Sequence, residues 1–230
     1  MIFSGIVKSS LIDYPGKIAT VLFVPGCNYN CFYCHNRGLI EEITDILDLD
    51  EINEFLQKRQ GLIDAIVISG GEPTLHDDLP IFFKSLKKLG YLTKLDSNGS
   101  NPEMISTLIE QGHVDYFAID YKAPMVKYPL YCGDNSNAIK VLESIQLLLN
   151  NHCQFEVRTT VIPQLSLDDL IQMAIEMPVI PRYVLNPYRK PIKYLDIHQD
   201  LINTPPYSEK QISEFAETLK LYQENVVLMF

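Results

Sequence analysis

Three closely spaced cysteines are the residues of this chain best suited to metal chemistry. Cys27, Cys31 and Cys34 follow a C-x3-C-x2-C spacing, and no fourth cysteine follows at a matching distance. Cysteine thiolates are the usual protein ligands of iron–sulfur clusters. Three thiolates can hold three irons of a cubane cluster and leave the fourth iron open to a small molecule with an amine and a carboxylate. The spacing therefore favours an iron–sulfur site with one exchangeable position.

Two other interpretations of the cysteines stay open at this point. A structural zinc site normally has four ligands, usually arranged in two pairs. His35, Cys132 or Cys153 could complete such a set, although the observed spacing is unusual for zinc. Buried thiols without any ligand are the other alternative. A disulfide scaffold is disfavoured, because the chain is long and its five cysteines are an odd number.

Glycine-rich and polar segments follow several apolar stretches of the sequence. The string Gly70-Gly71-Glu72-Pro73 follows one stretch, and Asp96-Ser97-Asn98-Gly99 ends another. Paired glycines allow a ligand to approach the backbone closely. Each string also has a simpler interpretation, since Gly-Gly-Glu-Pro can be an ordinary turn and Asn-Gly is a common hairpin turn.

Three charged residues lie in or directly after apolar stretches. Asp120 and Lys122 are two residues apart, so on a strand both side chains point to the same face. They can face one ligand, or they can form a simple surface pair. Arg158 lies inside an apolar stretch, where a charge is rarely buried without a partner. We therefore expect Arg158 to contact a ligand or a carboxylate.

The elements that position these residues alternate between strands and helices. Strands are expected at 18–24, 63–69, 91–96, 114–120, 155–161 and 182–185, which are rich in Val, Ile, Phe and Tyr. Between them, apolar residues recur every three or four positions, as in amphipathic helices. Four such stripes are Leu79/Phe82/Phe83/Leu86/Leu89, Met104/Ile105/Leu108/Ile109, Ile139/Leu142/Ile145/Leu149 and Ile212/Phe215/Ala216/Leu219. Helix starts are indicated at Asn101-Pro102, Ser166 and Ser208.

This alternation predicts an α/β fold with a parallel sheet and right-handed crossovers. Six strands favour an incomplete (β/α)6 barrel over the closed form, which has eight; an open doubly wound sheet is the alternative. One domain over residues 1–230 is expected. Because barrel enzymes place their sites at the carboxyl ends of the strands, the polar segments should converge there. Two long segments, 123–137 and 186–206, are expected to serve as a lid or a docking surface.

Composition excludes several classes of function. The net charge of −10 disfavours generic binding to nucleic acid or to anionic lipid. The N-terminal residues do not have the pattern of a signal peptide, and no apolar run approaches membrane-spanning length. We therefore expect a cytoplasmic protein without a membrane partner, in which the thiols stay reduced and can bind metal.

The cysteine string, with Tyr33 before the third cysteine, resembles the signature of the radical S-adenosylmethionine (SAM) superfamily. The chain opens with SLIDYPGKIATVLFVPGCNYNCFYCHN and continues with SGGEP, LDSNGSNP, IDYKAP and EVRTTVIP. In this order the strings are similar to the anaerobic ribonucleoside-triphosphate reductase activating proteins of that superfamily. The resemblance covers the chain to about residue 161 and continues more loosely from residue 182.

The resemblance implies a cofactor pair. Cys27, Cys31 and Cys34 would ligate three irons of a 4Fe–4S cluster, and SAM would chelate the fourth iron through its amine and carboxylate. The backbone of residues 70–73, together with Asp96, would receive the amine of the methionine part. Further SAM contacts are expected from Lys122 at the carboxylate, Asp120 at the ribose, Tyr33 and Asn36 at the adenine, Arg158 at the carboxylate or ribose, and Asn98.

The resemblance also implies a reaction and partners. An electron from a reduced flavodoxin or ferredoxin would cleave SAM to methionine and a 5′-deoxyadenosyl radical, which would install a glycyl radical on an anaerobic ribonucleotide reductase. Two alternatives remain. One is a radical SAM enzyme acting on a small molecule, like the 7-carboxy-7-deazaguanine synthases. The other is a noncatalytic zinc-stabilised binding protein, which would contain one zinc ion and would not cleave SAM.

Overall fold

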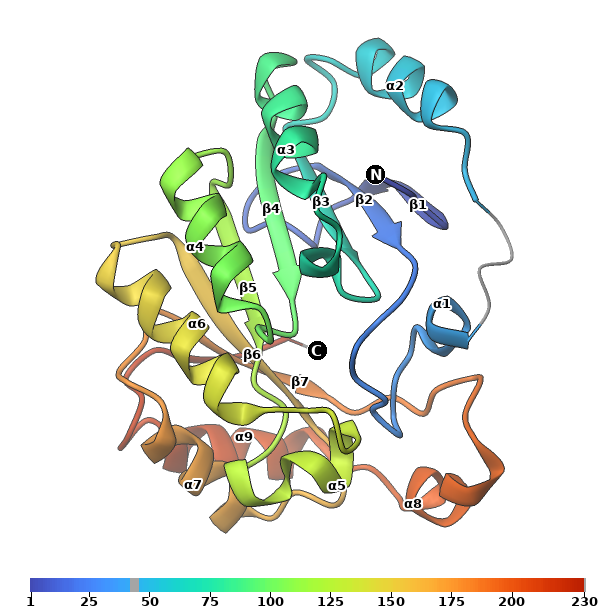
Figure 1. Cartoon of the computed structure of the whole chain (residues 1–230). Helices are drawn as coiled ribbons and strands as arrows, with labels where there is room; N and C mark the ends of the chain where they lie inside the picture. The colour runs from blue at the N-terminus through green and yellow to red at the C-terminus, as the bar shows by residue number, and fades with distance from the viewer. Residues whose placement is uncertain (42–45, 230) are drawn as a thin grey trace.

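The fold is built around one eight-stranded sheet (Figure 1), seen in a computed structural model that describes residues 1–41 and 46–229. The strands lie side by side in chain order from β1 to β8. Their bounds are β1 Gly5–Ser10, β2 Ala19–Val24, β3 Ala65–Gly70, β4 Leu92–Ser97, β5 Tyr116–Asp120, β6 Phe155–Val161, β7 Tyr183–Pro187 and β8 Val226–Leu228.

The sheet is open and mostly parallel. Strands β2 to β8 pair in parallel, and only β1 runs antiparallel, against β2. The linear order leaves β1 at one edge and β8 at the other, so the barrel does not close. The expected incomplete barrel of six parallel strands is confirmed as β2–β7. Strands β1 and β8 were missed, because β1 has three exposed residues in a row and β8 has only three residues.

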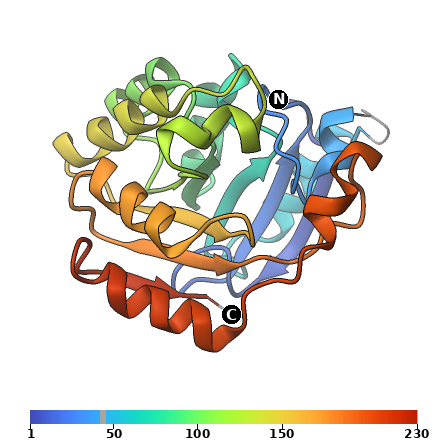
Figure 2. The same cartoon turned by 90° about the horizontal axis from the view of Figure 1, so that it is seen from below.

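Helices cover the convex side of the sheet (Figures 1 and 2). They begin where capping chemistry predicts. The Asn101 side chain accepts from the backbone N–H of Met104, and both Ser166 and Ser208 form complete capping boxes. The α-helices are α1 Arg37–Glu41, α2 Leu49–Lys58, α3 Leu79–Lys88, α4 Pro102–Gln111, α5 Tyr128–Cys132, α6 Ala138–Asn150, α7 Leu167–Glu176, α8 Gln199–Asn203 and α9 Glu209–Leu219.

The buried face of α6 differs from the expected stripe. Ile139 is largely exposed, whereas Val141, Ile145 and Leu148 are fully buried. More than half of the residues of this helix are apolar, so the sequence allowed two overlapping stripes. Ser144, which is also buried, decides between them by donating to the carbonyl of Gly99 at 2.7 Å.

The two long segments contain short helices instead of irregular loop alone. The first carries the 3-10 turn η2 Met125–Lys127 and α5, and the second carries η3 Asp196–His198 and α8. Both segments lie at the carboxyl end of the sheet (Figure 1). They therefore border the site that the strands position.

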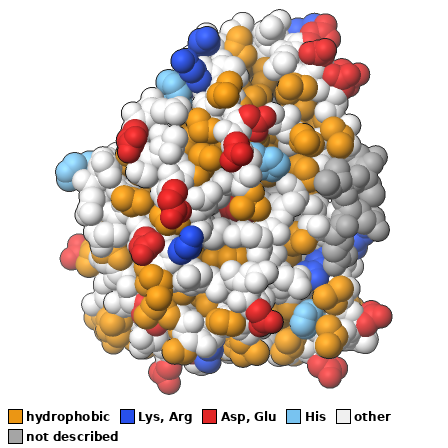
Figure 3. Space-filling model, viewed as in Figure 1, with side chains coloured by type: hydrophobic (Ala, Val, Ile, Leu, Met, Phe, Trp, Pro, Cys, Tyr) orange, Lys and Arg blue, Asp and Glu red, His pale blue; other side chains and the backbone are white. Residues whose placement is uncertain are grey.

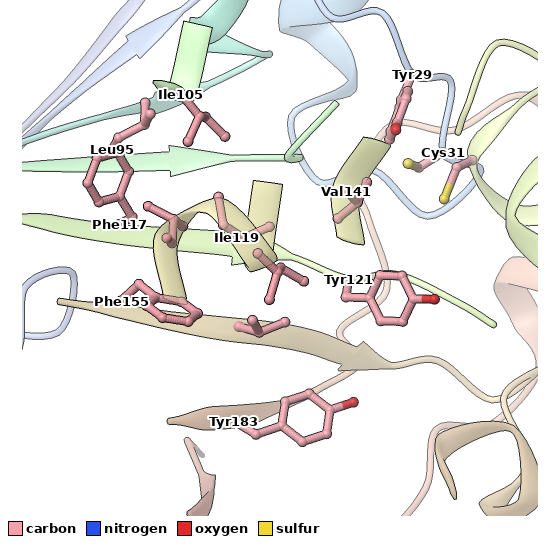
Figure 4. Packing of buried hydrophobic residues seen from close by; sticks show 14 of the residues in the cluster. Tyr29, Cys31, Leu95, Ile105, Phe117, Ile119, Tyr121, Val141, Phe155 and Tyr183 are labelled. Carbon is pink, nitrogen blue, oxygen red and sulfur yellow. The ribbon is translucent and has the colours of Figure 1, made fainter. Parts of the chain in front are cut away.

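Large apolar side chains fill the space between the sheet and its helices (Figure 4). Leu95, Ile119 and Phe117 come from neighbouring strands and pack against Ile105 of α4 and Val141 of α6. The core continues to the carboxyl end of the sheet through buried tyrosines such as Tyr29 and Tyr121 and reaches Cys31. The cysteine loop is therefore attached to the main core. In the described part of the chain, no helix has the length and apolar character needed to cross a membrane.

Candidate active site

One cavity of about 220 Å³ lies at the carboxyl ends of the central strands. Five chain segments contribute to it, as the barrel topology predicts. Twelve residues singled out in the sequence line this cavity: Cys27, Cys31, Tyr33, Cys34, Asn36, Gly70, Gly71, Asp96, Asn98, Asp120, Lys122 and Arg158. Residues that are up to 131 positions apart in the sequence, from Cys27 to Arg158, thus face the same space.

Backbone hydrogen bonds hold the cysteine loop in place. The N–H groups of Asn30 and Phe32 donate to the carbonyls of Cys132 and Tyr131, at 2.8 and 3.2 Å. These two acceptors lie at the end of α5, so the first long segment supports the loop directly. The N–H of Gly26 donates to the carbonyl of Leu39 at 2.8 Å and connects the loop to α1.

The three thiols have different surroundings. Burial raises the pKa of Cys27 to about 12 and also raises the pKa of Cys34. A hydrogen bond from the Cys132 thiol, assisted by the charge of Lys122, lowers the pKa of Cys31 despite its burial. Cys27 also accepts from the backbone N–H of Tyr29 at 3.4 Å. The surroundings therefore favour the thiolate at Cys31, whereas at Cys27 and Cys34 burial outweighs the nearby donors.

Among the described residues, no three His, Cys, Asp or Glu side chains are grouped closely enough to hold one metal ion. Cys27, Cys31 and Cys34 nevertheless all line one cavity, so one bound group can contact all three.

The Gly-Gly-Glu-Pro turn packs tightly against the start of the cysteine loop. A Cβ on Gly71 would lie 1.8 Å from the carbonyl oxygen of Gly26, and one on Gly70 would lie 2.6 Å from the backbone of Val24. Gly70 also has φ of +114°, in the region that side chains other than glycine rarely adopt. The two glycines therefore allow two segments of the protein to pack closely against each other.

Glu72 is fully buried and does not line the cavity, and neither does Pro73. The carboxylate of Glu72 accepts from the Thr74 N–H at 3.0 Å, the Ser97 hydroxyl at 2.8 Å and the Asn98 N–H at 2.6 Å. Burial raises its pKa, although these bonds act in the opposite direction. In this structure Glu72 fixes the end of β3 to the end of β4, which positions Asn98 beside Cys27.

Charged side chains form a continuous group across the inner face of the sheet. Lys122 Nζ lies 2.9 Å from Asp120, as the expected common orientation of these residues predicts. Arg158 joins two carboxylates, at 3.0 Å from Asp120 and 3.1 Å from Asp96. The expectation that Arg158 needs a partner is therefore met by carboxylates of the protein.

The chain of ion pairs continues away from the cavity. Lys94 Nζ lies 3.1 Å from Asp96 and 3.8 Å from Glu156, and Arg182 lies 3.0 Å from Glu156. Lys94, Glu156 and Arg182 were not predicted from the sequence as part of the site. A signal was present for two of them, because Lys94 and Glu156 are two residues before Asp96 and Arg158 and so share their face of the sheet.

The cations keep the carboxylates ionised in spite of burial. Burial alone would raise the pKa of Asp120, but Lys122 and Arg158 outweigh it and lower the pKa to about 2. Arg158 and Lys94 likewise outweigh burial and lower the pKa of Asp96. Both groups are therefore anionic at neutral pH.

The other two cysteines lie in different parts of the molecule. Cys132 is buried behind the cysteine loop and contacts Cys31, so it belongs to the surroundings of the site. Cys153 lies elsewhere, in a surface depression with Phe155 and Ile180. His35 lines the cavity next to Cys34.

The chain is similar in sequence to known proteins over most of its length. It is 35% identical to a protein of Methanocaldococcus jannaschii whose name marks it as a candidate glycyl-radical enzyme activating enzyme, across 98% of this chain and 94% of the relative. A second protein of that organism, with the same kind of name, is 32% identical across 75% of this chain and 67% of the relative.

Solved structures share the fold at low sequence identity. SuiB of Streptococcus suis, crystallised with S-adenosylmethionine, has a TM-score of 0.69 and 14% identity, covering 91% of this chain and 52% of SuiB. TYW1, solved with a lysine-pyruvate adduct, has a TM-score of 0.61 and 18% identity, covering 89% of this chain and 74% of TYW1. The family model of the radical SAM superfamily matches residues 21–176, which include every residue lining the cavity. The chain belongs to the radical SAM superfamily.

Proposed function

We propose that this protein is an activating enzyme that installs a glycyl radical on an anaerobic ribonucleoside-triphosphate reductase. The observation that carries the proposal is the single cavity in which the cysteine triad faces a chain of paired charges. Relatives named as glycyl-radical enzyme activating enzymes support the class of reaction.

The residues present fit the iron–sulfur cluster that the family implies. Cys27, Cys31 and Cys34 all line the cavity. They would hold three irons of a 4Fe–4S cluster. Asn98 Nδ2 lies 3.8 Å from the sulfur of Cys27, so an amide donor already points at one of the proposed ligands. Such donors stabilise the negative charge of a thiolate-bound cluster.

The cavity also fits SAM, whose methionine part carries both an amine and a carboxylate. The buried hydroxyl of Tyr33, which lies in the cavity wall, makes no hydrogen bond within the described residues. Buried polar atoms normally have partners, so this hydroxyl is suited to a bound molecule. In this proposal Asp96 and the backbone at Gly70 receive the amine, and Lys122 pairs with the carboxylate.

The nucleoside part of SAM would be placed by the other residues of the cavity wall. Asp120 is positioned to accept from the ribose, and Arg158 holds Asp120 in its orientation at 3.0 Å. Tyr33 and Asn36 would contact the adenine. Asn36 Nδ2 donates to the carbonyl of Gly70 at 3.0 Å, so its orientation is already fixed.

When bound and reduced, the cluster would cleave SAM to methionine and a 5′-deoxyadenosyl radical. The protein supplies binding and orientation for that chemistry. The paired charges at Asp96, Asp120 and Lys122 present fixed partners that need little rearrangement. The sheet stays open between β1 and β8, which leaves a side through which a loop of a large protein substrate can approach.

Electron paramagnetic resonance of a mixture with a candidate reductase tests the proposal. The purified chain is reconstituted anaerobically with iron and sulfide, reduced, and incubated with SAM and an anaerobic ribonucleotide reductase encoded in the same genome. We expect the doublet of a glycyl radical on the reductase, and no doublet with the Cys31→Ala variant. SAM cleavage without a doublet, together with turnover of a pterin, would support the small-molecule alternative. A colourless protein with one zinc ion would contradict both.

A further inference from the structure

A short basic segment stands out on the surface of this acidic protein. Residues 189–193, here called the basic patch, contain Arg189, Lys190 and Lys193, although the whole chain has a net charge of −10. All three cations are exposed, and Ile192 between them is 98% exposed. No carboxylate of the described residues forms an ion pair with any of the three. The described residues therefore leave the positive charge of the patch without a neutralising carboxylate.

Contacts on both sides hold the basic patch in shape. Pro191 is buried, and so is the preceding Tyr188, whose hydroxyl donates to the carbonyl of Ile202 at 3.3 Å. Lys190 donates to the side chain of Asn203 at 2.6 Å. A binding partner would thus meet a preorganised surface, which reduces the entropy lost on association.

The basic patch lies directly beside the cysteine loop. The ring of His35 is hydrogen-bonded to the backbone of Arg189, and His35 follows Cys34 in the chain and lines the same cavity. Lys193 Nζ lies 3.7 Å from the position that a Cβ on Gly38 would occupy, at the start of α1. Figure 3 shows basic side chains at the right-hand edge of the molecule, between α1 and α8.

We propose that the basic patch is the docking site for an acidic protein that delivers single electrons to the metal centre. The inference rests on the proposed function, because it needs a cluster at the cysteine loop. At each encounter the carrier loses one electron and the centre gains one, and no covalent bond forms or breaks. Electron transfer weakens steeply with distance, so a carrier must bind close to this loop.

Electrostatics favour such a carrier at the patch. Opposite charges steer two proteins into encounter and raise the association rate, most strongly at low salt. The chain as a whole has a net charge of −10 and would repel an acidic carrier, so Arg189, Lys190 and Lys193 favour contact at this place. The exposed Ile192 offers an apolar contact at the centre of the charges.

Charge reversal with a matched control tests the docking site. The test variant is Arg189→Glu/Lys190→Glu/Lys193→Glu. The control reverses three exposed cations on α3 and α6, which lie outside the cavity: Lys84→Glu, Lys88→Glu and Lys140→Glu. Because Lys190 also bonds Asn203, a second test variant, Arg189→Glu/Lys193→Glu, retains that anchor. Circular dichroism checks that all variants are folded.

The first readout is binding of an acidic flavodoxin, measured by calorimetry on the reconstituted protein. We expect the test variants to bind about tenfold or more weakly at about 20 mM salt, with a smaller difference at about 200 mM. The control should stay within about twofold of wild type. Equal affinities for test and control variants, or no flavodoxin binding by the wild type, would overturn the proposal.

The second readout compares reductants. With dithionite, which needs no docking site, the test variants should cleave SAM at the wild-type rate; with reduced flavodoxin they should be slower. Normal flavodoxin binding with loss of the glycyl radical under dithionite would instead assign the patch to the protein substrate and overturn the proposal. Absence of dithionite-driven cleavage by the wild type would count against the proposed function, while the binding comparison would still decide the docking site.

Discussion

Replacing Lys94 by Met should destabilise the protein far more than replacing a surface lysine with a similar ion pair. Lys94 is 2% exposed, and its ammonium lies 2.6 Å from the carbonyl of Asp13, 3.1 Å from Asp96 and 3.8 Å from Glu156. Removing one partner of a buried ion pair typically costs about 3–5 kcal/mol. Asp96 and Glu156 each keep an arginine, so we expect the lower end, about 3 kcal/mol.

Lys87→Met is the matched control for this prediction. Lys87 lies 2.8 Å from Asp115, but both side chains are about 30% exposed, and pairs of this kind contribute about 1 kcal/mol or less. Urea denaturation of the apo protein measures both variants. If Lys94→Met costs no more than Lys87→Met, the buried charge chain does not stabilise the sheet in the way described. The double variant with Asp96→Asn should cost less than the sum of its single substitutions, because both act on one pair.

Four further predictions concern the site. Cys31→Ala should abolish iron binding whereas Cys153→Ala should keep it, and equal iron loss in both would contradict the ligand assignment. Arg158→Lys gives up one of two carboxylate contacts and should raise the Kd for SAM about tenfold by calorimetry; an unchanged Kd would count against its role. Glu72→Gln turns one of the two acceptor oxygens into a donor and should cost about 2–3 kcal/mol in urea denaturation, and a cost near zero would refute its structural role. The depressed pKa of Asp120, about 2, adds stability that is complete above its unfolded value of about 3.9 and is lost as the pH falls towards about 2; Asp120→Asn should remove that loss from the stability profile.

Much of the fold follows from the pattern of apolar residues. The six central strands appear near their expected positions, because strands covered on both faces have continuous apolar sequences. The edges were not predictable in this way. Strand β1 has three exposed residues in a row, and β8 has only three residues, so neither leaves a clear pattern. On α6 so many residues are apolar that the sequence did not show which face of the helix is buried. The hydrogen bond of Ser144 to Gly99 identifies that face.

The site was predictable wherever several segments had to converge on one edge of the sheet. Barrel topology brought the cysteine loop, Asp96, Asp120 and Arg158 to one cavity. What the sequence could not provide was the partner of each charge. The contact between Arg158 and Asp96 depends on which strands are neighbours and in what register, and the buried position of Glu72 depends on a turn of the backbone.

In the proposed metal centre, the protein leaves one iron open for SAM. Electron–nuclear double resonance on the reduced, reconstituted protein tests it directly, with SAM labelled by nitrogen-15 in its amine. We predict a hyperfine coupling between the labelled nitrogen and the cluster, which disappears when unlabelled SAM replaces it. No coupling at saturating SAM, with a fourth protein side chain bound to the cluster, would contradict the account.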